Sequence, residues 1–213
     1  MRLQEKLVVL VSSTVYGIEE LLDRVYTLLT AFGYEVWMSH KGTMPVFPDC
    51  SNFDNCIKAV EKCDLFIGLI TPYYGSGICA GEISITHQEL RKAIELNKPR
   101  WLLAHDHVVF ARSLLKNLGY TNSEGRKELT LTENNSALND LRIIDMYEEA
   151  ILVETPLDGR QGNWVQNFQS NEDASLFVTA QFSRYQEVEA FISDNFANQP
   201  KLTEASKRGG GSS

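Results

Sequence analysis

Three adjacent hydroxyl side chains, Ser12, Ser13 and Thr14, directly follow an apolar run over residues 7–11. An amphipathic pattern begins a few residues later, so the hydroxyls occupy a turn from a predicted strand into a predicted helix. Hydroxyls in such a turn either cap the helix or hold a polar ligand, because backbone N–H groups at a helix start bind phosphate or ribose oxygens well. Both interpretations stay open for these residues.

A carboxylate, Glu89, lies early in a helix predicted over residues 82–97, and Glu82 is a rival carboxylate before it. A carboxylate beside ribose C1′ stabilises the positive charge that develops when an N-glycosidic bond breaks, or attacks that carbon to form a covalent intermediate. Thr86-x-x-Glu89 is also the pattern of a capping box, in which the glutamate only satisfies a backbone N–H. His87 beside it is either a proton shuttle or a solvated side chain.

Two polar loops follow other predicted strands, with the sequences SHKGTMPVFPDCSN and TPYYGSGICAG. Tyr73, Tyr74 or Trp37 could stack on a base, and a turn at Gly75 would let the backbone approach a ligand closely. The complete set of candidate substrate-binding residues is Ser12, Ser13, Thr14, Phe47, Tyr73, Tyr74, Gly75, Ser84, Thr86 and His87, with Glu89 as the candidate catalytic residue.

Apolar runs alternate with amphipathic segments over the first 120 residues. The predicted strands are 7–11, 34–38, 64–70 and 100–104, and the predicted helices are 18–32, 52–61, 82–97 and 108–118. This alternation predicts an α/β fold, a flavodoxin-like parallel sheet with helices on both faces. Ligands bind at the carboxyl ends of the strands in such sheets, so the candidate residues should converge there.

The carboxyl-terminal third has a different pattern, in which helices are predicted over residues 138–153 and 174–196. We therefore predict an α/β domain over residues 1–120 and a helical extension packed on it, or offering an oligomerisation surface, over residues 121–200. Residues 201–213 resemble a flexible tail or a cloning remnant.

Composition and charge narrow the classes of partner. The formal net charge of −8 over 213 residues disfavours nucleic acid and anionic membrane surfaces. No apolar stretch approaches the roughly 20 residues of a membrane span, and the start lacks signal-peptide features. The cysteines Cys50, Cys56, Cys63 and Cys79 show no zinc-ligand spacing, so we expect free thiols in the cytoplasm and no metal.

These motifs together resemble a TIR-like family. The matching pieces are V-S-S-T, C-D-L-F-I-G-L-I followed by Y-Y-G, and S-I-T-H-Q-E-L-x-x-A-x-x-L-N-K-P, over about residues 6–104. Members of this family are usually described as domains of unknown function at the front of bacterial proteins. The part of this match from C-D-L-F-I-G-L-I to L-N-K-P is distantly similar to nucleoside deoxyribosyltransferases and to TIR domains that cleave NAD. Asn97 stands where those families often have glycine.

The resemblance implies that Glu89 is the catalytic carboxylate of an NAD glycohydrolase or cyclase. Such an enzyme would release nicotinamide and an ADP-ribose product, with NAD as substrate and no other cofactor. The resemblance also implies a role in anti-phage signalling for that product. Two alternatives stay open: a TIR-like module that binds a nucleotide or another copy of itself without catalysis, and base exchange on nucleosides. The aspartate pair typical of the deoxyribosyltransferases is absent, which weakens the second alternative.

Overall fold

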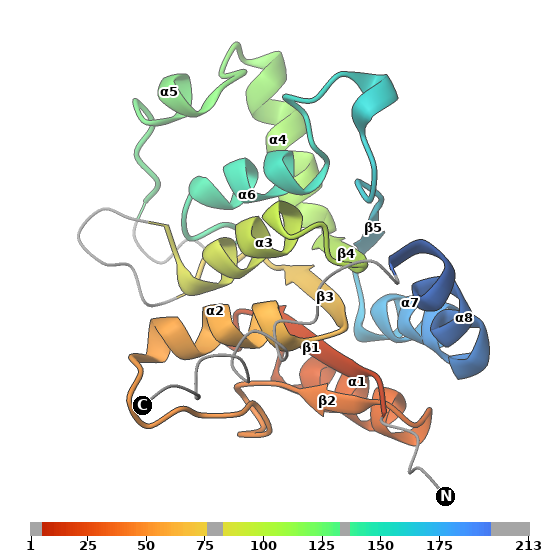
Figure 1. Ribbon diagram of the computed structural model, residues 1–213. Coiled ribbons are helices and arrows are strands. Elements are labelled where there is room, and N and C mark those ends of the chain that lie inside the picture. The colour runs from red at the N-terminus through yellow and green to blue at the C-terminus, as the bar shows by residue number, and fades with distance from the viewer. Residues whose placement is uncertain (1–5, 76–82, 133–136, 197–213) are drawn as a thin grey trace, which may run out of the picture.

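The structure, a computed structural model, describes residues 6–75, 83–132 and 137–196. Its centre is a parallel sheet with the strand order β2-β1-β3-β4-β5 (Figure 1). The strands are β1 (Val8–Ser13), β2 (Glu35–Trp37), β3 (Leu65–Ile70), β4 (Arg100–His105) and β5 (Val165–Phe168). The predicted α/β class, with a parallel sheet between helices, is confirmed.

Helices cover both faces of this sheet (Figure 1). The first half of the chain contributes α1 (Glu19–Ala31), α2 (Asn52–Lys62), α3 (Ile85–Glu95) and α4 (Asp106–Asn117). The second half contributes α5 (Ser123–Arg126), α6 (Arg142–Ala150), a 3-10 turn at Leu157–Gly159, α7 (Asn171–Phe182) and α8 (Tyr185–Phe196). None of the helices in the described ranges is long and apolar enough to cross a membrane.

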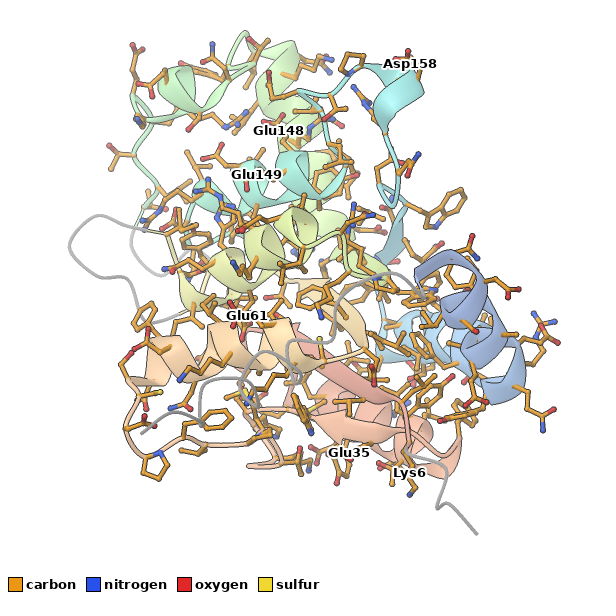
Figure 2. All side chains as sticks on the ribbon, viewed as in Figure 1. Lys6, Glu35, Glu61, Glu148, Glu149 and Asp158 are labelled. Atoms are coloured by element: carbon orange, nitrogen blue, oxygen red, sulfur yellow. The ribbon has the colours of Figure 1, made fainter. Side chains whose placement is uncertain are left out.

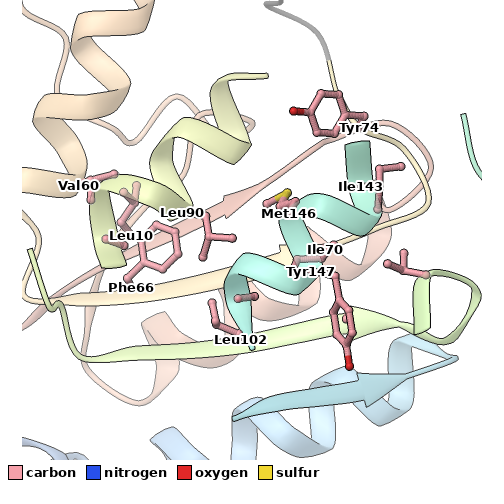
Figure 3. Packing of buried hydrophobic residues seen from close by; sticks show 14 of the residues in the cluster. Leu10, Val60, Phe66, Ile70, Tyr74, Leu90, Leu102, Ile143, Met146 and Tyr147 are labelled. Atoms are coloured by element: carbon pink, nitrogen blue, oxygen red, sulfur yellow. The ribbon is translucent and has the colours of Figure 1, made fainter. Parts of the chain in front are cut away.

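Alternation along each strand divides the core into two layers. In β1, Leu10 packs with α2, α3 and α6, whereas Val9 and Val11 pack on the opposite face with α1 and α7. In β4, Leu102 packs in the same layer as Leu10, and Leu103 packs in the layer of Val9 and Val11. Figure 3 shows the first layer, in which side chains of α6 meet those of the strands and α3. Both faces of the sheet are therefore buried, as the near-continuous apolar strands predict.

The carboxyl-terminal third is helical, and it also adds the edge strand β5, which the sequence analysis missed. The single helix predicted over residues 174–196 is two helices, α7 and α8, because the first ends at Phe182. Glu82, Cys79 and the predicted tail over residues 201–213 lie outside the described residues.

Candidate functional site

Three of the candidate residues, Ser12, Thr14 and Glu89, lie where the direction of the chain across the sheet reverses. From β1 the chain crosses to β2 on one side, and from β3 it crosses to β4 on the other. The carboxyl ends of β1 and β3 lie side by side, with Ser12 opposite Gly68 and Ser13 opposite Leu69. Such a topological switch point is where open α/β sheets bind their ligands.

Glu89 reaches this switch point from α3. The Ser12 hydroxyl donates a hydrogen bond of 2.5 Å to Glu89 Oε2, and the two residues are only 3% and 7% exposed. Ser12 shares the strand face of Leu10, which is the face that α3 covers. Because strand side chains alternate, Ser13 points to the other face, where its hydroxyl donates to the carbonyls of Thr14 and Leu69 at 2.9 and 3.3 Å. Ser12 therefore binds the Glu89 carboxylate, whereas Ser13 binds backbone carbonyls on the opposite face of the sheet.

Cys56 of α2 is the second partner of Glu89, and the sequence analysis did not identify it. Burial raises the pKa of the Cys56 thiol to about 12, and the charge and hydrogen bond of Glu89 add to this shift. Cys56 is therefore a neutral donor toward the carboxylate. Its position on a helix other than α3 gave no sequence signal, since only the packing of α2 against α3 brings the two residues together.

The environment of Glu89 disfavours its charged form. Burial raises the pKa of Glu89 from 4.5 to about 7, although the hydrogen bonds from Ser12 and Cys56 act in the opposite direction. Desolvation thus outweighs the two donors. A carboxyl group with this pKa exchanges its proton near neutral pH, and strongly shifted groups of this kind are often found at functional sites.

The structure contradicts both capping interpretations. The N-cap of α3 is Ser84, whose hydroxyl accepts from the His87 N–H, so Thr86-x-x-Glu89 is not a capping box. Helix α1 begins at Glu19 with Ile18 as its N-cap and has no side-chain cap. The hydroxyls after β1 therefore do not cap α1. Ser84, in contrast, has a structural role that the sequence analysis did not assign to it.

The Thr14 hydroxyl lies across the switch point from β3. Its oxygen is 2.7 Å from the hydroxyl oxygen of Thr71, just after β3. Gly75 packs directly over this pair with φ +89°, and a Cβ there would lie 2.5 Å from Thr14 Cγ2 and 3.8 Å from the Thr86 hydroxyl oxygen. The close approach that the structure shows at Gly75 is to Thr14 of the same chain, whereas the predicted approach of this backbone to a ligand stays a prediction.

The first tyrosine of the Tyr73-Tyr74 pair faces the β1–α1 loop. Tyr73 is partly exposed, and its ring packs edge-on against Tyr16, with centroids 5.0 Å apart. Gly17 lies against the same ring, with 3.0 Å between an added Cβ and Tyr73 Cε2. Tyr16 is 70% exposed, so this edge offers aromatic surface next to the hydroxyls. Tyr16 is not among the residues predicted from the sequence to bind a substrate.

The second tyrosine belongs to a separate buried cluster. The Tyr74 hydroxyl is 2.8 Å from His87 Nδ1, and its ring lies under the guanidinium of Arg142. On its other side, His87 Nε2 is 3.1 Å from a Glu149 carboxylate oxygen without hydrogen-bond geometry. Figure 2 shows Glu149 on α6. His87 is 1% exposed, so it is not the solvated histidine that one interpretation expected.

Glu149 contrasts with Glu89 because it has charged partners. Burial alone would raise its pKa, but two hydrogen bonds from Arg91 at 2.6 and 2.7 Å and the contact with His87 hold the pKa of Glu149 at about 2. Glu149 is therefore a permanent carboxylate that ties α6 to α3. Glu89 has only neutral donors among its recorded partners.

The contacts of Phe47 and Trp37 are with residues other than the switch-point hydroxyls. The Phe47 ring lies beneath the ammonium group of Lys62 at 3.9 Å, and Asn55 binds its backbone N–H at 2.7 Å. The Trp37 ring is buried in the core beside α2, and its N–H donates to Glu35. Within the described part of the chain, no group of three histidine, cysteine or acidic side chains could hold a metal ion.

The chain belongs to the family described as Domain of unknown function (DUF4062), whose model matches residues 8–197. The match includes the sheet, the switch-point residues and the helices of the carboxyl-terminal third. A comparison with curated proteins finds no match.

Proposed function

We propose that this member of the DUF4062 family is an N-glycosidase that cleaves the bond between nicotinamide and ribose in NAD, with Glu89 as its catalytic carboxylate. The observation that carries the proposal is the position of Glu89, buried at the switch point with the Ser12 hydroxyl 2.5 Å away. The resemblance to TIR-like, NAD-cleaving domains supports the same residue.

The chemistry needs a carboxylate in a place with little water. When the C1′–N bond breaks, its electron pair moves to the pyridinium ring, which leaves as neutral nicotinamide, and positive charge develops on the ribose. An ionised Glu89 stabilises that charge more strongly when buried than in water. The pKa of about 7 in the free protein means that a cationic substrate can draw Glu89 into its charged form near neutral pH.

The surrounding residues suggest how the nucleotide would lie. The hydroxyls of Thr14 and Thr71 would face the ribose, and the aromatic edge of Tyr16 and Tyr73 would contact a base. The phosphates would not sit at the start of α1, because Glu19 and Glu20 occupy its first turn. The sequence led us to expect phosphate or ribose oxygens at that helix start, and of these two we now propose that the phosphates lie elsewhere.

Nicotinamide release from NAD, followed by chromatography, tests the proposal. We expect Glu89→Gln to lower the rate at least about 100-fold, as for other groups that act directly on the reacting atoms. Glu95→Gln is the matched control, since Glu95 is an exposed carboxylate on the same helix, paired with Lys92. Turnover that survives Glu89→Gln unchanged would reject Glu89 as the catalytic group.

A second candidate function is a module that binds a nucleotide without cleaving it. The observation that favours it is that Glu89 already has two partners, Ser12 and Cys56, and is almost completely buried. Calorimetry separates the two functions. Binding of NAD by both the unchanged protein and Glu89→Gln, with no nicotinamide release by either, would favour the binding module.

A further inference from the structure

An asparagine of the carboxyl-terminal third holds the β3 loop, which we define as residues 71–75. The Tyr74 N–H donates a hydrogen bond of 2.8 Å to Asn139 Oδ1, and the Asn139 N–H donates one of 3.1 Å to the Pro72 carbonyl. Backbone groups that have left a strand need partners outside the sheet, and Asn139 supplies two of them. A single residue therefore binds the loop backbone at two points.

The residues on either side of Asn139 are fixed to the rest of the protein. Leu138 is 5% exposed and packs in the same core layer as Tyr74. Asp140 Oδ1 accepts from the Arg142 N–H at 2.8 Å and from Arg142 Nε at 3.0 Å. The Arg142 guanidinium lies 4.7 Å from the centroid of the Tyr74 ring, and Figure 3 shows Tyr74 beside the start of α6. Asn139 is thus held in place against the β3 loop.

The β3 loop carries one side of the switch point. The Thr71 hydroxyl oxygen accepts from the Tyr73 N–H at 3.2 Å and lies 2.7 Å from the Thr14 hydroxyl oxygen. The Tyr73 ring packs edge-on against Tyr16. Thr71 and Tyr73 each directly adjoin a residue whose backbone is bonded to Asn139. A change in these two bonds would therefore move the residues that face the proposed nucleotide.

We propose that Asn139 is a positioning residue of the nucleotide site, which holds the β3 loop so that the Thr71 hydroxyl and the Tyr73 ring face the substrate. This inference rests on the proposed function, since it takes the nucleotide to lie against this loop. Asn139 acts through the loop backbone, and the recorded partners of Glu89 are on β1 and α2 instead. The loop contacts serve substrate and transition state alike, so their loss raises KM and changes kcat little.

Steady-state kinetics of nicotinamide release from NAD by the full-length protein test the inference. We expect Asn139→Ala to raise KM about fivefold and to leave kcat within about twofold, because one ordinary hydrogen bond to the loop is lost. Asn122→Ala is the matched control. Asn122 is also exposed, and its Oδ1 also accepts a backbone N–H at 2.8 Å, that of Gly125 at the start of α5. This control should leave both KM and kcat unchanged.

Amide hydrogen exchange measured by NMR gives a second readout that needs no activity. The Tyr74 amide should exchange faster in Asn139→Ala than in the unchanged protein or in Asn122→Ala, while the amides of β1 and β3 keep their rates. If the unchanged protein binds NAD without cleaving it, the Kd from calorimetry takes the place of KM, and the same fivefold change is expected.

The outcomes separate this inference from the proposed function. An unchanged Tyr74 exchange rate in Asn139→Ala, or an unchanged KM where the unchanged protein does release nicotinamide, would overturn the role of Asn139 and leave the proposed function standing. NAD that the unchanged protein neither cleaves nor binds would overturn the proposed function, and this inference with it.

Discussion

At the scale of single residues, Glu89 occupies a place where its charge is unfavourable. Burial raises its pKa to about 7, and its recorded partners are the neutral groups of Ser12 and Cys56. Glu149, three helices later along the chain on α6, is also largely buried but has a cationic partner, Arg91, which helps to hold its pKa at about 2. A buried carboxyl group without a cation costs stability, so its presence at the edge where open α/β sheets usually bind ligands favours a functional role.

The free energy of unfolding should depend on pH because of this buried carboxyl group. The folded state holds the Glu89 proton more tightly than the unfolded state, so the associated stability is present below about pH 4.5 and is lost as pH rises through about 7. With the pKa raised by about 2.5 units, the loss is about 3 kcal/mol. Glu89→Gln should unfold with nearly the same free energy as the unchanged protein at pH 4.5, and be about 3 kcal/mol more stable at pH 8.

Denaturant unfolding of both proteins across this pH range measures the difference. If the difference in free energy of unfolding stays constant between pH 4.5 and pH 8, Glu89 is not the perturbed group that its burial indicates.

The two neighbouring serines should behave differently. The hydrogen bond from Ser12 lowers the pKa of Glu89, so Ser12→Ala should move the pH-dependent step in stability upward by about one pH unit. Ser13→Ala should leave the midpoint of that step in place, because the Ser13 hydroxyl bonds backbone carbonyls on the other face of β1. The same denaturant titration serves for both variants, and equal shifts would show that Ser12 has no special contact with Glu89.

At the scale of elements, the site depends on how β1 and β3 end. The loop after β3 folds back over Thr14, and Gly75 with φ +89° makes that contact. Strands β1 to β4, helices α1 to α4 and the convergence of Ser12 and Glu89 at one sheet edge were predicted from the sequence, because these follow from periodicity and from the topology. Which serine faces α3 was not predicted. Strand alternation would have answered that, once the register of Leu10 was known.

Gly75→Ala tests the importance of this contact. An alanine there combines an unfavourable φ with a Cβ 2.5 Å from Thr14 Cγ2. Gly119→Ala is a matched control, since Gly119 has φ +95° and no atom within 4 Å of an added Cβ. We expect Gly75→Ala to lose about 2 kcal/mol more than Gly119→Ala in thermal or chemical unfolding. Equal losses would mean that the loop adjusts without cost and that the contact with Thr14 is unimportant.

At the scale of the whole molecule, the carboxyl-terminal third completes the core. Strand β5 pairs with β4, α6 buries Ile144 and Met146 in one layer, and α7 buries Phe182 in the other. The Tyr185 hydroxyl accepts a hydrogen bond of 2.9 Å from the N–H of Leu7, just before β1. The last helices therefore return to the start of the sheet.

Sequence periodicity could not reveal β5 or the break between α7 and α8. The strand is short, and Gln166 and Asn167 give it no apolar alternation, as often happens at a sheet edge. The amphipathic spacing continues through Ser183 and Arg184, where no proline or glycine marks the end of α7. Both features depend on tertiary packing, which local patterns do not contain.

A chain that ends at residue 120, at the predicted domain boundary, should not fold on its own. It would expose both core layers and the edge of β4 that β5 covers. We expect this fragment to show no cooperative thermal transition and a poorly dispersed amide NMR spectrum, in contrast to the full chain. A cooperative transition with native-like dispersion would establish residues 1–120 as an independent domain.

The most direct test of the central claim is a carbon-13 NMR titration of the Glu89 carboxyl group, assigned by its loss in Glu89→Gln, with and without NAD. The account predicts a midpoint near pH 7 in the free protein. It also predicts a lower midpoint with NAD, because the positive pyridinium ring favours the ionised carboxylate. A Glu89 resonance that titrates near pH 4.5 and does not respond to saturating NAD would contradict it.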